Sequence, residues 1–479
     1  GPEVTYGATS FLAQNTAADI VVLGEGDETT PALLRALSSQ KDLNSVPGIV
    51  YRQGDEIVTT QKREALVDMD EIVFAYNEES ISAYAHKILY YESMRGCPFS
   101  CAYCLSANER TLRTKSLEKV CEELSFFIAH RVPIVKFTDR TFNVDTARAL
   151  HIWRFIKEYN RATTFHFEIA ADLLTEAHLT LLESMPTGFV QLEIGVQSAN
   201  EKTLQAICRT TDLNKISDSV KRLAKAGNIH LHTDLIAGLP YETYDSFRAS
   251  FNFVYGLGGH MLQLGFLKIL QGSPMEPIAK KQHYVYESRA PYEVLSTPWL
   301  SFEELLRLKA IEQLVEKYAN SQSFSHILAH IIPRLYHKDA FLFFEELAAY
   351  FTHQGLFQRK LSKPDLYTVL SDFLTHKSFD TGICRTLLQF DYLLCMSAPL
   401  PKALTLPMLT KTELFEAVEN NRALFPEKYS SLPYKQLIKH LRVYVFDRNP
   451  LTLQPSSTPI AFWHLPNKKT SSLLPVFLN

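Results

Sequence analysis

Hydrophobic residues follow two alternating patterns between residues 88 and 270. Short apolar runs, typical of buried strands, alternate with longer stretches in which apolar residues recur every three or four positions, typical of amphipathic helices. Predicted strands cover residues 88–91, 134–137, 164–169, 190–194, 230–236 and 261–270. Predicted helices between them include residues 146–159, 176–184 and 213–226. Strands that alternate with helices in this way indicate an α/β fold with a parallel sheet or barrel.

A further helix is predicted after the first strand. Ser116 is a suitable N-cap, and an apolar stripe of helical spacing follows it. Cys121 belongs to this stripe, so we expect its thiol on the buried face of the helix.

The N-terminal residues predict a strand, a glycine turn and a helix. Residues 19–23 form a short apolar run suited to a buried parallel strand. The turn Gly24-Glu25-Gly26 follows, and Thr30-Pro31 is expected to open the helix, with proline in the permitted first turn. Residues 41–88 are interpreted as a connector that contains a hairpin around residues 53–56.

The pattern changes after residue 285. Ser301 and Glu304 form a capping-box pattern before a helical stripe, and residues 340–350 are strongly apolar and helical. Cys384 and Cys395 lie on predicted helices and are interpreted as core residues. These features predict a mainly helical C-terminal region.

The last fifty residues are basic and aromatic. From Lys428 onward there are seven Lys and Arg against one acid, Asp447, with Tyr, Phe and Trp between them. Such an end could bind RNA through phosphate contacts and base stacking. Alternatively, residues 441–446 form an edge strand protected by lysines, and we favour this structural interpretation.

Composition narrows the class of protein. The 479 residues are 46% hydrophobic and 21% charged, which is typical of a globular protein of several domains. No apolar run reaches 18 residues, so no membrane span is expected, and the net charge of −3 gives no overall nucleic-acid signal. Seven cysteines with three clustered do not resemble a disulfide framework, and they favour the reducing cytoplasm.

The clustered cysteines carry the strongest chemical signal. Cys97, Cys101 and Cys104 are spaced C-x3-C-x2-C in a loop after the first strand. Three thiolates can hold three corners of a four-iron cluster, which leaves the fourth iron open for a ligand that is not protein. Zinc sites usually pair two short Cys/His clusters instead. The alternative is three thiols that bind no metal.

Four polar residues stand at or near the ends of predicted strands, where barrels place their ligands. Glu168 lies among large apolar residues and needs a partner such as an α-amino group. Gln197 follows Gly195, where glycine allows a close approach, and its amide suits ribose hydroxyls. Arg209 suits a carboxylate, and Asp234 is placed to accept two hydroxyl protons. The alternative for each residue is a satisfied structural hydrogen bond.

The cysteine loop resembles the cluster loop of the radical S-adenosylmethionine (radical SAM) enzymes. The resemblance implies a [4Fe-4S] cluster on Cys97, Cys101 and Cys104, with Tyr103 as the usual aromatic residue before the last ligand. It also implies that S-adenosyl-L-methionine chelates the open iron and is cleaved to methionine and a 5′-deoxyadenosyl radical. The protein would supply position and electrostatics to these cofactors.

The four strand-end residues resemble the SAM-binding set of the oxygen-independent coproporphyrinogen oxidase branch of that superfamily. The resemblance implies that Glu168 and Arg209 hold the methionine end, whereas Gln197 and Asp234 hold the ribose. It also implies that the loop with Thr138 and Asp139 contacts the SAM amino group, mainly through its backbone.

Other polar residues of these strands receive structural interpretations. His166, His230 and His232 are interpreted as satisfied core or pore-wall groups rather than ligands. Cys208 could reach the cavity, but packing is the favoured interpretation.

The N-terminal motif, beside the cysteine loop, resembles the last third of the cobalamin-binding domain of class B radical SAM methylases. Gly1, Pro2, Gly24, Glu25 and Gly26 match its cobalamin contacts. Gly1-Pro2 could be a cleavage scar, but the match favours native sequence and a chain that begins inside that domain. No D-x-H-x-x-G motif for a lower axial histidine occurs in the sequence.

The expected fold is α/β: a partial (β/α)6 radical SAM barrel, preceded by the end of a Rossmann-like cobalamin-binding domain and followed by a mainly helical domain. The expected domains are residues 1–80, 81–285 and 286–479. The implied function is cobalamin-dependent methylation of an unactivated carbon by way of the deoxyadenosyl radical and methylcobalamin. Alternatives are tRNA-base modification, a non-methylating rearrangement or oxidation, and a non-catalytic iron–sulfur protein. The expected partners are a small-molecule, peptide or tRNA substrate and an electron donor such as flavodoxin or ferredoxin.

Overall fold

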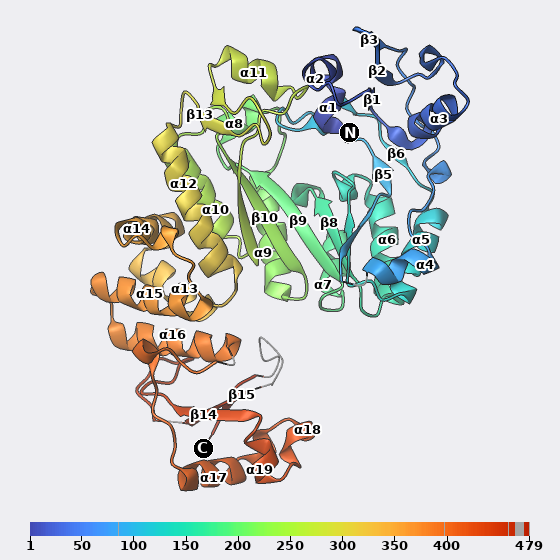
Figure 1. The fold of residues 1–479 in the computed structure, drawn as a ribbon. Coiled ribbons are helices and arrows are strands. Elements are labelled where there is room, and N and C mark those ends of the chain that lie inside the picture. The colour runs from blue at the N-terminus through green and yellow to red at the C-terminus, as the bar shows by residue number, and fades with distance from the viewer. Residues whose placement is uncertain (85, 397, 458, 465–473, 479) are drawn as a thin grey trace. The chain divides into compact units, whose positions relative to one another are not determined.

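The computed structural model describes residues 1–84, 86–396, 398–457, 459–464 and 474–478. The chain divides into two compact units, Gly1–Leu306 and Arg307–Asn479 (Figure 1). Each unit is considered by itself. No helix in the described ranges is long and apolar enough to cross a membrane.

The first unit is built on a six-stranded parallel sheet whose strands follow one another in the order β11-β10-β9-β8-β7-β4. The strands are β4 (Ile88–Tyr91), β7 (Ile134–Phe137), β8 (Thr164–Ile169), β9 (Val190–Gln197), β10 (His230–Ala237) and β11 (Met261–Phe266). The helices between them are α5 (Leu117–Ala129), α6 (Thr146–Tyr159), α7 (Glu176–Glu183), α8 (Glu201–Ala206), α9 (Leu213–Ala226) and α10 (Tyr244–Tyr255) (Figure 1). The predicted α/β fold with six βα units is confirmed.

Several element boundaries match the prediction, and two strands differ from it by more than one residue. β9 continues to Gln197, three residues past the predicted end. Its residues alternate between buried and partly exposed along the whole strand. β11 ends at Phe266, four residues before the predicted end, because the chain leaves the sheet there. Lys268 instead forms an antiparallel bridge with Glu293.

Large aromatic side chains fill the space between the sheet and its helices. Phe167 of β8 lies 4.5 Å from Phe137 of β7 and 4.3 Å from Phe142, measured between ring centroids, and Trp153 of α6 packs edge-on against it at 6.0 Å. All four side chains are buried. Burial of one such ring contributes about 1.5–3 kcal/mol, so this cluster fixes α6 on the sheet. The opposite face of the strands is then left for polar residues.

The position of Cys121 on α5 is a correction. Ser116 caps the helix as predicted, with its side chain accepting from the Lys119 amide, but Cys121 is only half buried at the edge of the packed face. Glu123 is the buried residue instead, and it accepts hydrogen bonds from the Tyr91 hydroxyl and the Lys115 ammonium, both at 2.7 Å. These two partners make burial of a carboxylate tolerable, which the apolar pattern could not indicate.

The N-terminal part of this unit has its own three-stranded sheet. It contains α1 (Pro2–Thr5), α2 (Ala8–Gln14), β1 (Ile20–Val22), α3 (Gly26–Ser38), β2 (Ile49–Gln53) and β3 (Glu56–Thr59). The hairpin of β2 and β3 is confirmed. The expected parallel pairing of β1 is wrong, because β1 pairs antiparallel with β2. A three-residue apolar run indicates burial but carries no information about strand direction.

The start of α3 also differs from the prediction. The helix begins at Gly26, and Pro31 lies inside it rather than in its first turn. Gly24 turns the chain with a positive φ of +64°, and Asp27 and Glu28 occupy the first turn, where carboxylates favour the helix dipole. These signals outweigh the one hydrogen bond that Pro31 removes.

Helices dominate the second unit. The helix α12 (Phe302–Leu314) leads into it, and Ser301 and Glu304 form the predicted capping box through reciprocal bonds of 2.8 Å and 3.2 Å. The longer helices that follow are α13 (Ser325–Leu335), α14 (Ala340–His353), α15 (Lys363–His376) and α16 (Thr381–Cys395). Cys384 and Cys395 lie on α16, and Cys384 is buried as predicted. The smaller helices α17 (Lys411–Asn420), α18 (Glu427–Ser430) and α19 (Tyr434–Leu437) come next.

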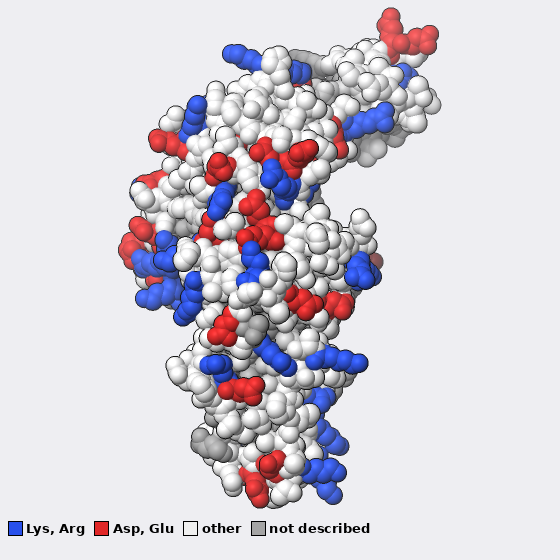
Figure 2. All heavy atoms as spheres, turned by 90° about the vertical axis from the view of Figure 1, so that its left-hand side faces the viewer, with Lys and Arg blue, Asp and Glu red and all other residues white. Residues whose placement is uncertain are grey.

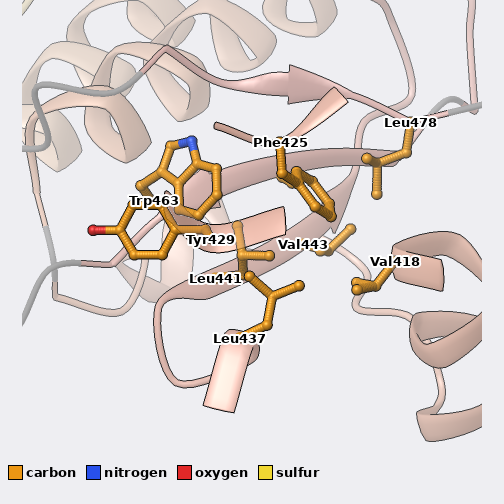
Figure 3. Packing of buried hydrophobic residues seen from close by; sticks show 9 residues of the cluster. Val418, Phe425, Tyr429, Leu437, Leu441, Val443, Trp463 and Leu478 are labelled. Atoms are coloured by element: carbon orange, nitrogen blue, oxygen red, sulfur yellow. The ribbon is translucent and has the colours of Figure 1, made fainter. Parts of the chain in front are cut away.

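The basic end of the chain forms a small packed sheet, in the order β14 (Leu441–Val445), β15 (Pro459–Trp463) and β16 (Val476–Phe477). β14 is an edge strand, as the favoured interpretation required. Figure 3 shows the core beneath it, where Trp463 packs on Tyr429 with ring centroids 4.7 Å apart. Tyr444, Phe446 and Phe462 are buried as well, so these rings support the sheet and are not displayed for base stacking.

Both signs of charge occur on the surface in view. Figure 2 shows Lys and Arg interspersed with Asp and Glu over much of the face that it presents. This distribution agrees with the small net charge of −3.

Candidate functional site

A cavity of about 340 Å³ opens at the carboxyl ends of the parallel strands, and all of its lining lies in the first unit. Its wall brings together most of the predicted site residues: Cys97, Cys101, Cys104, Tyr103, Glu168, Gln197, Arg209 and Asp234. These residues come from the cysteine loop, from β8, β9 and β10, and from the segment after α8. The site therefore assembles groups that are up to 137 residues apart in the sequence, from Cys97 to Asp234.

The cysteine loop is shaped by backbone contacts. Gly96 has a φ of +89°, and a side chain there would collide with the Thr111 carbonyl, so only glycine fits. The Cys97 amide donates to the Glu109 carbonyl at 2.9 Å, and the Ala102 amide donates to the Ile207 carbonyl at 2.9 Å. All three thiols are free. The loop thus presents three unpaired cysteines to one cavity.

A β-bulge directs Gln197 into the site. Asp234 of β10 pairs with Gly195, but the next residue, Leu235, pairs with Gln197, so Val196 is an extra residue in β9. Gln197 adopts a positive φ of +71°. A Cβ on Gly195 would collide with the Gln197 amide. The glycine was expected to admit a ligand, and here it makes room for the side chain of Gln197.

Arg209 connects the cysteine loop with β9. Its Nη1 lies 3.1 Å from the Tyr103 hydroxyl and 3.7 Å from Cys101 Sγ, and its Nη2 donates to the Gly195 carbonyl. Burial opposes the charge of the guanidinium, but Tyr103 and Cys101 outweigh it and raise the pKa of Arg209. Arg209 is therefore a permanent cation in the wall of the cavity.

Cys208 does not have its predicted environment. Its side chain is exposed rather than packed, and it is not part of the cavity wall. Cys208 has a positive φ of +54° just after α8, so the chain turns there and directs the next residue, Arg209, inward.

Three carboxylates create an acidic interior. Burial, followed by the charge of Glu193, raises the pKa of Glu168 above its usual value. Burial raises the pKa of Asp234 to about 8, with the charges of Glu193 and Glu168 adding to the effect. Glu193 behaves differently: burial is outweighed by contacts with His166 and Lys136, which lower its pKa to about 2. A cationic ligand would relieve the repulsion among these groups.

The contact of Thr138 and Asp139 with SAM through the backbone stays a prediction, and both residues have partners within the fold. Asp139 is fully buried and accepts from the Ser93 amide at 2.8 Å, the Ser93 hydroxyl at 2.5 Å and the Met94 amide at 3.2 Å. Burial outweighs these bonds and raises its pKa to about 6. The Thr138 amide donates to the Tyr91 carbonyl at 2.8 Å. Neither residue lines the cavity, whereas Arg140 and Thr141 of the same loop do.

The predicted cobalamin residues are not part of this cavity wall. Gly1 caps α1, which begins at Pro2, and Gly26 begins α3. A Cβ on Gly24 would meet open space.

Glu25 is engaged by two arginines of the hairpin β5 (Met94–Arg95) and β6 (Arg113–Thr114) that flanks the cysteine loop. Its pKa falls to about 2 because Arg113 and Arg95 outweigh the cost of burial. The Glu25 carboxylate therefore holds the N-terminal turn against the hairpin.

Sequence reasoning missed several residues of the site. Phe99, Ser106, Asp172 and Glu193 line the cavity, while Lys136 and His166 contact Glu193. A usable signal was present for the strand residues. Residues two positions apart share one face of a strand. Each of these residues precedes, by two positions, a residue already singled out: Lys136 precedes Thr138, His166 precedes Glu168, Glu193 precedes Gly195, and His232 precedes Asp234.

The fold and the cysteine cavity together define a known class of domain. Residues 91–254 match the family model described as the radical SAM superfamily, so this part of the chain is a radical SAM domain. Residues 280–460 match a second model, described as a protein of unknown function (DUF4080).

The relatives of the chain include cobalamin-dependent enzymes. It is 26% identical over 383 residues to the cobalamin-dependent radical SAM methyltransferase TokK of Streptomyces tokunonensis, covering 76% of this chain and 53% of that protein. It is 26% identical over 389 residues to the 2-(S-pantetheinyl)-carbapenam-3-carboxylate methyltransferase of Streptantibioticus cattleyicolor, covering 73% and 56%. The chain thus spans about half the length of these relatives.

A solved structure shares the fold over most of the chain. It is that of the cobalamin-dependent S-adenosylmethionine radical enzyme OxsB with aqua-cobalamin bound. It matches with a TM-score of 0.55 and 15% identity, over 92% of this chain and 70% of that chain.

Proposed function

We propose that this protein is a cobalamin-dependent radical SAM methyltransferase that acts on an unactivated carbon. The observation that carries the proposal is the convergence of Cys97, Cys101 and Cys104 with Glu168, Gln197, Arg209 and Asp234 on one cavity. The 26% identity to two methyltransferases supports the methyl-transfer step in particular.

The donor set of the cavity fits a [4Fe-4S] cluster and SAM. Three free thiols on one loop can take three irons, and this leaves one iron open. Among the described residues, Gln197 Oε1, Asp234 Oδ1 and Arg209 Nε are buried side-chain atoms without a hydrogen bond. Unpaired buried polar atoms are costly, so their presence indicates that a polar ligand completes them.

Each residue then has a defined task. Glu168 binds the α-amino group, whose positive charge removes the repulsion between the buried carboxylates. Asp234 and Gln197 take the ribose hydroxyls by accepting and donating hydrogen bonds. Arg209 orients the carboxylate end while it fixes Tyr103 and the cysteine loop.

When bound, the cluster, SAM and cobalamin would supply a 5′-deoxyadenosyl radical for hydrogen abstraction and a methyl group for transfer. The protein holds these groups at the carboxyl ends of the strands and limits access of water to the reacting carbon. Arg140 and Thr141 on the cavity wall are available to a substrate beside the SAM contacts.

We assign the backbone of the N-terminal turn to cobalamin. The open space at Gly24 leaves the turn accessible. The Glu25 side chain is engaged with Arg95 and Arg113, so we assign Glu25 to positioning the turn rather than to direct contact.

The same proposal includes three domains, with the limits 1–80, 81–285 and 286–479. It also includes a cytoplasmic location and an electron donor of the flavodoxin or ferredoxin type. The substrate class proposed is a small molecule or a peptide. Modification of a tRNA base is disfavoured because the aromatic side chains of the basic end, such as Phe446 and Trp463, are packed in a core.

The experiment follows a methyl label. The anaerobic protein is reconstituted with iron, sulfide and cobalamin, supplied with methyl-labelled SAM and reductant, and incubated with fractionated cell extract. Label in small molecules or peptides that is lost in Cys97→Ala is the expected result. Label in RNA would favour tRNA modification, and deoxyadenosine without transferred label would favour a non-methylating reaction.

A further inference from the structure

The interior of the barrel carries a second polar layer beneath the SAM-contact residues. Lys136, His166, Glu193 and His232 come from the four neighbouring strands β7, β8, β9 and β10 (Figure 1). Barrel interiors are normally filled at such positions by Val, Ile and Leu. Four titratable side chains in one layer cost desolvation energy, which favours a ligand-binding role over packing.

Three of these residues converge closely enough to share one ion. One ligand atom from each of His166, Glu193 and His232 lies within 4.8 Å of the other two. His166 and His232 are 92% and 93% buried, the complements of their exposed fractions of 8% and 7%. His166 Nε2 lies 3.0 Å from Glu193 Oε2, and His232 Nε2 lies 3.2 Å from Asp234 Oδ1, so each imidazole faces a carboxylate oxygen. Two buried imidazoles beside Glu193 have the ligand types of a two-histidine, one-carboxylate metal site.

Lys136 is placed as an outer-shell partner, which bonds a ligand of the ion rather than the ion itself. Lys136 Nζ donates to Glu193 Oε2 at 2.8 Å. With Oε2 held by Lys136, Oε1 is the carboxylate oxygen that we assign to the ion. A charged hydrogen bond to a ligating carboxylate is a common second-shell feature.

Charge favours a cation over an anion here. Glu168, Glu193 and Asp234 place three carboxylates in the interior, and Lys136 is the ammonium that contacts two of them. The ammonium of SAM would neutralise Glu168 only. Arg209 already supplies a second cation to the cavity wall, so the attraction for a divalent ion comes from its own carboxylate ligand, Glu193.

We propose that His166, Glu193 and His232 bind a divalent first-row transition-metal ion, separate from the iron–sulfur cluster. Glu193 lines the cavity, so the open coordination positions of the ion face the space in which a substrate would lie. There the ion acts as a Lewis acid that binds and orients an oxygen or nitrogen of the substrate.

The test uses Zn²⁺ as the probe and the full-length chain with Cys97→Ala, Cys101→Ala and Cys104→Ala, because these thiols bind zinc themselves. The chelator-treated protein is titrated with Zn²⁺ against a competing chromophoric chelator. We expect one bound equivalent. His166→Ala or His232→Ala is expected to weaken binding by at least about 100-fold, and Lys136→Met by about tenfold, as for loss of an outer-shell partner.

The matched control is His230→Ala, which removes an imidazole from the same strand, two residues before His232, and should leave zinc affinity unchanged. Circular dichroism of His166→Gln and His232→Gln shows whether each variant keeps its secondary structure. A variant that is folded but binds zinc weakly has lost a ligand rather than the fold. Zinc K-edge absorption of the wild-type reconstituted protein should show nitrogen and oxygen ligands without sulfur.

The proposal is overturned if the chain without Cys97, Cys101 and Cys104 binds no zinc, or if its zinc affinity survives loss of both histidines. In either case, the four residues form only a self-neutralising ion cluster. The readout does not involve radical chemistry, so this result is independent of whether the proposed methyl transfer occurs.

Discussion

The guanidinium of Arg209 lies 3.1 Å from the hydroxyl of Tyr103 and donates a second hydrogen bond to the Gly195 carbonyl. One side chain thereby fixes the cysteine loop relative to strand β9. The position of the three cysteines and the shape of the cavity wall are consequently coupled.

Arg209→Lys should weaken SAM binding, because an ammonium cannot reach the loop, the strand and a carboxylate at once. Hydrogen bonds to charged groups contribute about 1.5–3 kcal/mol, which corresponds to a loss of about 10- to 100-fold. Equilibrium dialysis of labelled SAM with the reconstituted protein measures the change. Arg222→Lys, at an ion pair on the surface of α9, is the control, and equal affinities in the two variants would contradict the assignment.

Loss of any one of Cys97, Cys101 and Cys104 should abolish cluster assembly. This outcome is checked by the iron and sulfide content after anaerobic reconstitution and by the visible absorbance of the cluster. Cys121→Ala, at a half-buried thiol that is not part of the cavity wall, should assemble a normal cluster. Iron content in Cys97→Ala equal to that of Cys121→Ala would remove the basis for the cluster.

Gly195→Ala should displace the amide of Gln197, because the new methyl group would occupy its place. SAM affinity should fall with little loss of stability, as the bulge itself remains. The double variant Gly195→Ala, Gln197→Ala relieves the collision, so the two effects should not add. Additive losses would show that the glycine acts independently of Gln197.

Asp391→Ala should destabilise the second unit. The buried carboxylate of Asp391 on α16 accepts the amides of His326 and Ile327, at 3.1 Å and 3.0 Å, at the start of α13. Two amides left without a partner cost about 1–3 kcal/mol each. Urea denaturation of the full chain measures the loss. Asp372→Ala, at a carboxylate on α15, is the comparison, and similar midpoints for the two variants would argue against the Asp391 contacts.

Stability of this unit should also depend on pH through His326. Its hydrogen bond to Asp391, at 2.7 Å, outweighs burial and raises the pKa of His326 above 6.5. Because the folded pKa is the higher one, the stabilisation is complete below the unfolded pKa and is lost as pH rises through the folded pKa. Denaturation midpoints from pH 5 to 9 should show this fall, and His326→Gln should remove that part of it.

The sequence determined the order of elements and the chemistry of the cysteine loop. Strand and helix patterns are local, so the bounds of β7, β8, α6 and α9 followed from periodicity alone. The three-cysteine motif is equally local, because its spacing lies within eight residues. Glu168, Gln197, Arg209 and Asp234 were found because each interrupts or ends an apolar run.

Tertiary structure decided which polar residues meet. Asp139 and Asp234 both stand near the end of a predicted strand. The Ser93 and Met94 amides bond the Asp139 carboxylate, whereas Asp234 lines the cavity. The direction of β1 and the burial of Glu123 likewise depend on partners distant in the chain. His166 and His232, read from the sequence as pore-wall groups, converge on Glu193 only when three strands align side by side. Periodicity specifies the face on which a residue lies, but packing of the whole sheet specifies its neighbours.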